Sequence, residues 1–230
     1  IDACSDKVNL LGEMAVEETG LGRMPDKMYK IQLVLDKTPL IEDVKPYAFS
    51  GDHGLTLVER APYGVLGAIT PSTNPVSTVI SNALSAIAAG NSIVFNPHPA
   101  AKSVTVKTIQ VLQEGIKNAD GPPDLITTIK EPTQQTGLSL FKNDKIALLL
   151  VTGGEAIVKL AMNSGKKVIA AGPGNPPVIV DETADIEKAA KDIVFGASFD
   201  NGVVCVLEKE VFVVESVADK LINQMQKNSA

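Results

Sequence analysis

Residues 65–88 read VLGAITPSTNPVSTVISNALSAIA, in which an apolar strand pattern runs into a helical pattern through a loop with two prolines. In the helical part, Val76, Val79 and Ile80 recur at spacings of three and four, which predicts one buried helix face. Pro75 falls in the first turn of that helix, where its missing N–H costs little. We therefore expect a strand, a turn and an amphipathic helix in this order.

The same alternation of strand and helix continues on the carboxyl side. Uninterrupted apolar strands separated by helices are typical of a parallel sheet covered on both faces, because each crossover places a helix on the sheet. The sequence therefore predicts a doubly wound, Rossmann-like α/β fold. We expect strands over 93–95, 125–129, 146–151 and 168–171, and helices over 101–117, 132–141 and 155–163.

The outer segments extend this pattern. A helix is expected from Val8 onward, a loop region after Gly20 and Gly22, an irregular connection over 35–54, and a half-exposed strand over 55–59. Toward the other end, we expect a helix over 186–195, a strand over 210–214 and an amphipathic helix over 216–227. No targeting segment precedes the first helix and the chain stops soon after the last, so we expect a piece of a longer protein.

Composition excludes several classes of protein. The 230 residues carry 21 Lys and Arg against 27 Asp and Glu, a net charge of −6, so no cation excess is present to bind a nucleic acid. The longest apolar run, 146–151, is far short of the roughly 20 residues that span a bilayer. Two cysteines and two histidines, far apart, indicate neither a disulfide framework nor a metal site. A reducing, cytoplasmic setting is favoured.

The fold class also predicts where a ligand binds. Doubly wound sheets bind ligands beyond the carboxyl ends of their strands, so loops 70–74, 96–99 and 152–154 should face one crevice. The sequence contains no G-x-G-x-x-G, so a different phosphate site is needed. Thr152-Gly153-Gly154 joins a strand to a helix, where backbone N–H groups can hold a pyrophosphate. An ordinary glycine turn explains these three residues equally well.

Cys205 is the candidate nucleophile. It falls in a connecting segment between the helix over 186–195 and the strand over 210–214, and such segments expose their side chains. A buried, inert thiol is the alternative, because free cysteine is among the most buried residue types. Cys4 is a weaker candidate. His98, flanked by two prolines, suits a rim position and His53 suits solvent, and spacing alone neither builds nor excludes a Cys–His pair.

Seven motifs stand along the chain: EETGLGR at 17–23, APYGVLGAITPSTNP at 61–75, GNSIVFNPHP at 90–99, VTGG at 151–154, AGPGNPP at 171–177, DETAD at 181–185, and the segment around Cys205. Together they resemble the aldehyde dehydrogenase superfamily, specifically the CoA-acylating branch that acts on acetaldehyde or propionaldehyde. The resemblance covers essentially the whole chain. Within the branch the motifs are similar to those of the ethanolamine- and propanediol-utilisation enzymes housed in bacterial microcompartments.

The resemblance implies roles for individual residues. Cys205 becomes the catalytic nucleophile, and the Asn74 amide forms the oxyanion hole with the Cys205 N–H. NAD is the implied cofactor, and no metal is expected. Hydrolytic relatives carry Lys in place of Asn96, and this departure concerns the contacts to the adenosine ribose of NAD. The implied NAD-binding residues are Thr70, Pro71, Ser72, Asn96, Pro97, His98, Pro99, Thr152, Gly153, Gly154, Ala171 and Gly172.

The most informative departure concerns Ala171. Hydrolytic relatives place there a glutamate that activates water, and alanine cannot accept a proton. A thioester that is not hydrolysed persists long enough to react with the thiol of CoA, which is easily ionised and strongly nucleophilic. A second departure is NGVV at 201–204, where the branch usually has Asn-Asn-Leu-Pro, and we expect looser positioning of Cys205 as a result.

The resemblance also implies an organisation. An NAD-binding domain over 1–182, incomplete at its start, should precede the beginning of a second α/β catalytic domain over 183–230. The expected partners are a small aldehyde, CoA, other copies of the chain, and microcompartment shell or lumen proteins in the bacterial cytoplasm. Two other interpretations stay open: a hydrolytic NAD(P)-dependent aldehyde dehydrogenase, which Ala171 opposes, and a non-enzymatic dinucleotide-binding or assembly fragment.

Overall fold

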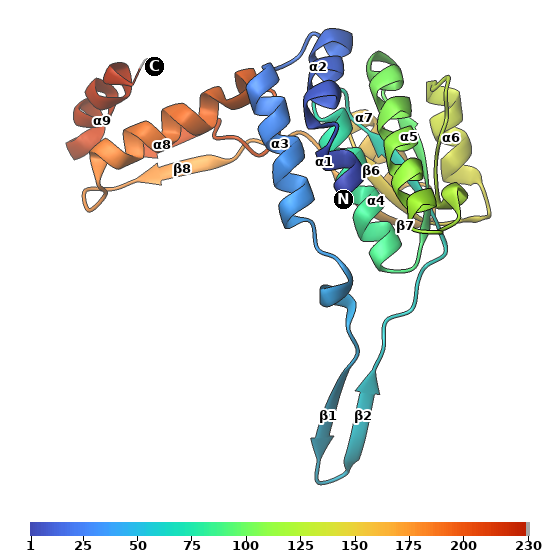
Figure 1. The fold of residues 1–230 in the computed structure, drawn as a ribbon. Helices are drawn as coiled ribbons and strands as arrows, with labels where there is room; N and C mark the ends of the chain where they lie inside the picture. Colours follow the sequence, from blue (N-terminus) through green and yellow to red (C-terminus); the bar gives the residue numbers. More distant parts are fainter. Residues whose placement is uncertain (229–230) are drawn as a thin grey trace.

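A five-stranded parallel sheet forms the centre of the larger, helix-covered part of the chain. The carboxyl-terminal segment projects from this part to one side (Figure 1). The computed structural model describes residues 1–228, so the last two residues of the expected second domain, 229–230, lie outside the described residues. The predicted doubly wound α/β fold is confirmed. In the order β5-β4-β3-β6-β7, the strands are Ile126–Thr128, Ser92–Pro97, Val65–Thr70, Ile146–Thr152 and Lys167–Ala171.

Helices cover both faces of this sheet. Successive residues of a strand point to opposite sides, so each strand packs against both layers of helices. In β6, Leu148 packs among the helices of one face, whereas Leu149 and Val151 pack among those of the other. The first face carries α4 (Pro75–Ala88) and α5 (Lys102–Asn118), with α1 (Asp2–Ser5), α2 (Val8–Thr19) and α3 (Met24–Lys37) packed on them. The second carries α6 (Gln134–Lys142) and α7 (Glu155–Met162).

The strand order reverses direction beside β3. From β3 the chain moves outward to β4 and β5, then returns to form β6 and β7 on the other side. Ligands of doubly wound sheets bind at such a reversal, beyond the carboxyl ends of the strands. The loops that follow β3 and β6 therefore flank the expected crevice.

The prediction of a loop region after Gly22 is wrong, because helix α3 begins at Met24. Pro25 lies in the first turn of this helix, where proline is compatible with helical backbone. The buried face of α3 carries Lys27 and Lys30 beside Ile31 and Leu35. Two lysines in the apolar stripe weaken the helical periodicity in the sequence.

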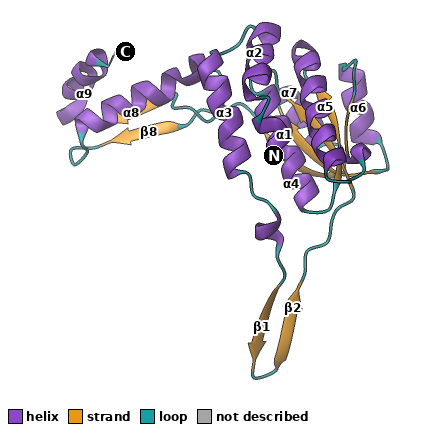
Figure 2. Ribbon diagram, in the orientation of Figure 1, coloured by secondary structure: helices purple, strands orange, loops and turns teal. Residues whose placement is uncertain are grey.

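The expected irregular connection over 35–54 is also wrong. It contains the end of α3, a short 3-10 helix (Ile41–Val44) and strand β1 (Tyr47–Gly51), which pairs antiparallel with β2 (Gly54–Val58). Figure 2 shows this hairpin standing apart from the helices. Its side chains are exposed on both faces except that of Val58, which is partly buried, so the strand expected to be half-exposed over 55–59 is almost fully exposed. His53, at the turn, is exposed as predicted.

The carboxyl-terminal segment forms a smaller parallel pair. Strand β8 (Pro177–Val180) pairs with β9 (Glu210–Val213), and helices α8 (Ile186–Ser198) and α9 (Glu215–Lys227) pack together beside it (Figure 1). The predicted apolar face of the last helix is confirmed by buried Val217 and Leu221. Strand β8 was not predicted, because four residues that begin with proline give little strand pattern. Within residues 1–228 no helix is long and apolar enough to cross a membrane.

Candidate active site

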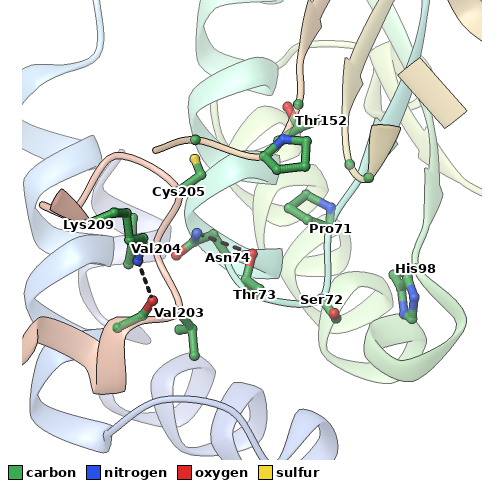
Figure 3. Close-up of a pocket in the computed structure, with 16 residues that line it drawn as sticks. Pro71, Ser72, Thr73, Asn74, His98, Thr152, Val203, Val204, Cys205 and Lys209 are labelled. Atoms are coloured by element: carbon green, nitrogen blue, oxygen red, sulfur yellow. Dashed lines mark hydrogen bonds between the residues drawn. The ribbon is translucent and has the colours of Figure 1, made fainter. Parts of the chain in front are cut away.

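A cavity of about 440 Å³ opens at the carboxyl edge of the sheet (Figure 3). Loops from β3, β6 and β7 meet there with the segment that follows α8. The lining residues are Pro71, Ser72, Thr73, Asn74, His98, Thr152, Gly153, Gly154, Gly172, Pro173, Gly174, Gly202, Val203, Val204, Cys205 and Lys209. The chain thus brings Cys205 and Asn74 together with the turn over 152–154.

Cys205 lies in the connection between α8 and β9 and is partly exposed. Its backbone lies directly against Gly174, since a Cβ built on Gly174 would be 1.9 Å from the Cys205 carbonyl oxygen. Only glycine permits this approach. The segment 172–174 therefore supports the cysteine from one side while Asn74 lines the cavity from another.

Cys4 is held in a different environment. It is buried in the core beneath α5, and burial raises the pKa of its thiol to about 11, an effect that the nearby amino terminus offsets only in part. At neutral pH Cys4 therefore stays a protonated thiol. The sequence-based ranking of Cys205 above Cys4 agrees with this placement.

Asn74 immediately precedes α4, and its side chain has a fixed orientation. Its Oδ1 accepts a hydrogen bond from Lys30 Nζ, and its Nδ2 donates to Thr73 Oγ1 at 3.4 Å. A lysine ammonium can only donate, so the oxygen end of the amide must face Lys30. In Figure 3 the amide nitrogen lies on the Cys205 side of the group.

A second cavity of about 320 Å³ adjoins the first along Pro71, His98 and residues 152–154. It is mostly apolar and is closed by α6 and α7. Thr70, Asn96, Pro97 and Pro99 line it, as expected for residues of one crevice. The two cavities together offer an elongated site across the point where the strand order reverses.

The turn over 152–154 suits a phosphate group in part. A Cβ built on Gly154 or on Gly172 would meet nothing within 4 Å, so a ligand can approach the backbone there. The N–H groups of the first turn of α7 are free of helical partners, as at every helix start. The Gly153 N–H is not available, because it donates to the Ala171 carbonyl at 3.1 Å.

Two of the predicted cofactor residues lie differently from the others. Ala171 lines neither cavity and contributes only that backbone carbonyl. Asn96 is buried, and its Oδ1 accepts a hydrogen bond from Thr136 Oγ1 at 2.5 Å, so α6 already occupies its acceptor. His98 lies on the exposed rim, with Nδ1 accepting from the Ala100 N–H at 3.2 Å.

The charges around the larger cavity are one-sided. No Asp or Glu is among the described residues that line it, whereas Lys209 does line it and donates to the Gly202 carbonyl at 2.8 Å. Within residues 1–228, no group of three His, Cys, Asp or Glu side chains could hold a metal ion. The sequence contained no signal for Lys209, whose place depends on the loop around Cys205.

A buried ionic cluster lies behind the site. Lys27 and Lys30 from α3 both donate to Asp200 Oδ2, and the three side chains are almost entirely buried. Burial lowers the pKa of Lys30 to about 8, although the hydrogen bond to Asp200 opposes the shift. Burial alone would raise the pKa of Asp200, but hydrogen bonds from Lys30, the Arg23 N–H and Lys27 hold it below its ordinary value.

The sequence pattern of the aldehyde dehydrogenase family matches residues 29–230. The chain belongs to this family. The resemblance inferred from the motifs is therefore confirmed.

Similar proteins within the family include dehydrogenases named as acetylating or CoA-propanoylating. The chain is 52% identical over 221 residues to the acetaldehyde dehydrogenase (acetylating) EutE of Escherichia coli (strain K12). The matched region covers 96% of this chain and 47% of that protein. The chain thus spans about half the length of the curated relatives it matches.

Solved structures of aldehyde dehydrogenases share the fold. A propionaldehyde dehydrogenase from the Clostridium phytofermentans fucose utilisation bacterial microcompartment matches with a TM-score of 0.95 and 46% identity, over 99% of this chain and 52% of that chain. The propionaldehyde dehydrogenase of Rhodopseudomonas palustris, with bound CoA and an acylated cysteine, matches with a TM-score of 0.93 and 48% identity, over 97% of this chain and 51% of that chain.

Proposed function

We propose that the whole protein oxidises a short-chain aldehyde, acetaldehyde or propionaldehyde, with NAD and transfers the acyl group to CoA through a thioester on Cys205. One observation carries this proposal: Cys205 and Asn74 share a cavity with the turn over 152–154, and no carboxylate is among the described residues that line it. The relatives that acylate CoA, about half of whose length the chain spans, support it.

The first step uses Cys205 and Asn74. The Cys205 thiolate attacks the aldehyde carbon, a C–S bond forms, and the carbonyl electron pair moves to oxygen as an alkoxide. The Asn74 Nδ2 and the Cys205 N–H donate hydrogen bonds to that oxygen. Removal of one such donor typically raises the barrier by about 3 kcal/mol.

The second step makes the thioester. The alkoxide re-forms its C=O bond as a hydride leaves the carbon, and bound NAD supplies the acceptor for that hydride. We propose that Gly154 and the start of α7 would hold the pyrophosphate of NAD, and that the second cavity, with Thr70, Pro71, Asn96, Pro97, His98 and Pro99, would hold its adenosine half. Ser72, which lines the larger cavity, would contact the cofactor from there. Gly172, whose backbone is open to the larger cavity, would face the nicotinamide half.

The third step releases the product. The CoA thiolate attacks the thioester carbon and Cys205 leaves as a thiolate, so the free enzyme is restored. Water competes poorly because no described side chain in the cavity is a carboxylate that could deprotonate it. One thioester is exchanged for another of similar energy, so the reaction should run in both directions. The acylated cysteine and bound CoA in the Rhodopseudomonas palustris enzyme support this order.

The test is formation of NADH from propionaldehyde by the whole protein, with and without CoA. We expect sustained turnover only with CoA, and none in Cys205→Ala, whose NAD affinity should stay unchanged. Cys4→Ala is the matched control and should keep full activity. After incubation with propionyl-CoA, intact-mass measurement should show the mass of one added propionyl group on the wild type and of none on Cys205→Ala. Multiple turnovers without CoA would contradict the acylating assignment and favour the hydrolytic one.

We further propose the organisation of the whole protein. Residues 1–182 act as the cofactor-binding domain and residues 183–230 begin the catalytic domain, with β8 contributing to the sheet of the latter. The protein works as a homo-oligomer inside a microcompartment of the bacterial cytoplasm, in contact with shell or lumen proteins. The microcompartment source of the Clostridium phytofermentans relative and the uncovered apolar side chains of the β1-β2 hairpin support this proposal.

A further inference from the structure

The buried cluster of Lys27, Lys30 and Asp200 has an unusual charge. Their exposed fractions are 3%, 8% and 0%, and two cations surround one anion. A buried charge is costly unless it is paired and hydrogen-bonded. The second cation must therefore find other acceptors, and both lysines find them in the loop that ends in Asn74.

These acceptors are the two residues just before α4. Lys27 Nζ donates to the Thr73 carbonyl at 2.6 Å, and Lys30 Nζ donates to Asn74 Oδ1. Since lysine offers donors only, Lys30 fixes the carboxamide with its oxygen away from the cavity and its NH₂ toward it. A rotation of the amide by 180° would place NH₂ against an ammonium group. The cluster thus determines which end of Asn74 is presented to the cavity.

The same cluster holds the turn that leads to Cys205. Asp200 and Asn201 have φ of 49° and 56°, and Gly202 has φ of 70°, a left-handed stretch that is unfavourable for the first two residues. Asp200 Oδ1 accepts from the Arg23 N–H at 2.8 Å, and the Asp200 N–H donates to Asp26 Oδ2 at 2.8 Å. Gly22 is required beside it, because a Cβ there would lie 2.1 Å from Asp200 Oδ1.

We propose that Lys30 is a positioning residue for the acyl-transfer reaction, which orients the Asn74 amide toward the aldehyde oxygen, while Asp200 ties this lysine to the turn that carries Cys205. This inference rests on the proposed function. Helix α3 has no side chain in the larger cavity. Through Lys30 it would nevertheless align the oxyanion donor, Asn74, with the nucleophile, Cys205.

Lys30→Met is the informative variant. It removes the donor to Asn74, keeps a flexible stem of similar length, and leaves Lys27 and Asp200 as a neutral pair, so the fold should tolerate it. In the whole protein we expect kcat for CoA-dependent propionaldehyde oxidation to fall about 100-fold, as removal of an oxyanion donor does. The affinity for NAD and the rate at which iodoacetamide alkylates Cys205 should stay unchanged, because neither needs the Asn74 amide and because Lys27, the Arg23 N–H and Asp26 still hold the turn at Asp200.

Two comparisons separate positioning from a structural role. Asn74→Ala should cause the same loss, and Lys30→Met should lose nothing more in an Asn74→Ala background, since both act through one hydrogen-bond donor. Lys30→Arg keeps donors in a different geometry and should recover part of kcat. Lys191→Met, the same substitution on an exposed lysine of α8, should match the wild type.

Wild-type kcat in Lys30→Met, or a multiplicative loss in the double variant, would overturn the inference. A parallel fall of Tm and of the Cys205 alkylation rate would also overturn it, since it would indicate a role in folding. If Lys30→Met did not fold, Lys30→Arg decides: reduced kcat with unchanged alkylation supports positioning, and wild-type kcat refutes it. Absence of CoA-dependent activity in the wild type would instead reject the proposed function, and the inference with it.

Discussion

Gly174 is a single residue whose lack of a side chain determines where the loop with Cys205 can lie. The Cys205 carbonyl occupies the space that a side chain at position 174 would need, as the 1.9 Å contact of a built Cβ shows. Backbone atoms cannot yield as the tip of a flexible side chain can. Any larger residue must therefore move the loop that carries Cys205.

Gly174→Ala should displace Cys205 and lower CoA-dependent turnover of the whole protein by at least about 100-fold, since misplacement of a reacting group by about 1 Å has effects of that size. The Tm should fall as well. Gly172→Ala is the control for folding, because a Cβ there meets nothing within 4 Å, and its Tm should equal that of the wild type. Normal turnover in Gly174→Ala would show that the contact with Cys205 is not needed.

Individual site residues were predictable to different degrees. Motif resemblance pointed to Cys205 and Asn74, which the structure places in one cavity. No local pattern could point to Lys27 or Lys30, because charged residues usually face solvent and their partner Asp200 is 170 residues beyond Lys30. Only the tertiary fold brings these charges together.

At the scale of elements, the EETGLGR motif explains how α5 begins. Helix α5 has no side-chain cap of its own, and Glu18 supplies one from α2: its carboxylate accepts from the Ser103 N–H at 2.8 Å and from the Val104 N–H at 2.7 Å. A negative charge at the start of a helix is also favourable for the helix dipole. Through Glu18 the motif therefore stabilises the packing of α2 on α5, which covers the sheet.

Glu18→Gln should lower the free energy of unfolding by about 1 kcal/mol, because the charge and one of the two hydrogen bonds are lost. Glu17→Gln, at the exposed neighbouring position, should change it by less than about 0.5 kcal/mol. Urea unfolding of both variants measures the difference. Equal effects of the two substitutions would mean that the bonds to α5 contribute no net stability.

Helices with a clean apolar stripe were predictable, and those with a mixed stripe were not. The spacing of apolar residues predicted α4 correctly, and its predicted face includes buried Val76, Val79 and Ile80. In α3 the buried face includes two lysines, whose burial is stabilised by acceptors far away in sequence. Periodicity measures hydrophobicity along one segment, so it cannot register a polar contact between segments.

For the whole molecule, alternation of apolar strands and helices predicted the parallel sheet but not its strand order, which depends on pairing between distant segments. Strand β2 of the hairpin was expected over 55–59, but β1 and the pairing of the two strands were missed, because β1 has no buried face within this chain. Tyr47 and Phe49 lie on one side of the hairpin and Leu55 and Leu57 on the other, all exposed. Apolar surface of this extent is typical of a protein contact.

If the hairpin joins copies of the protein, Leu55→Ser with Leu57→Ser should shift the whole protein toward smaller assemblies in sedimentation velocity. The substitutions remove apolar surface from the contact, and unfolding of the sheet core should be unaffected. Thr56→Ser, on the opposite face of the same strand, is the control. An unchanged sedimentation coefficient in the double variant would place the oligomer contact elsewhere.

The ion pair between Lys30 and Asp200 joins positions 170 residues apart. During synthesis on the ribosome, α3 emerges long before the turn that contains Asp200, so while the sheet is forming Lys30 lacks the carboxylate that holds it in place, and the Asn74 amide has only an unanchored lysine as its partner. Contacts of such long range close late, after local helices and neighbouring strands. The nascent polypeptide therefore carries an unaligned cysteine, and reactivity toward aldehydes should arise only at the end of folding.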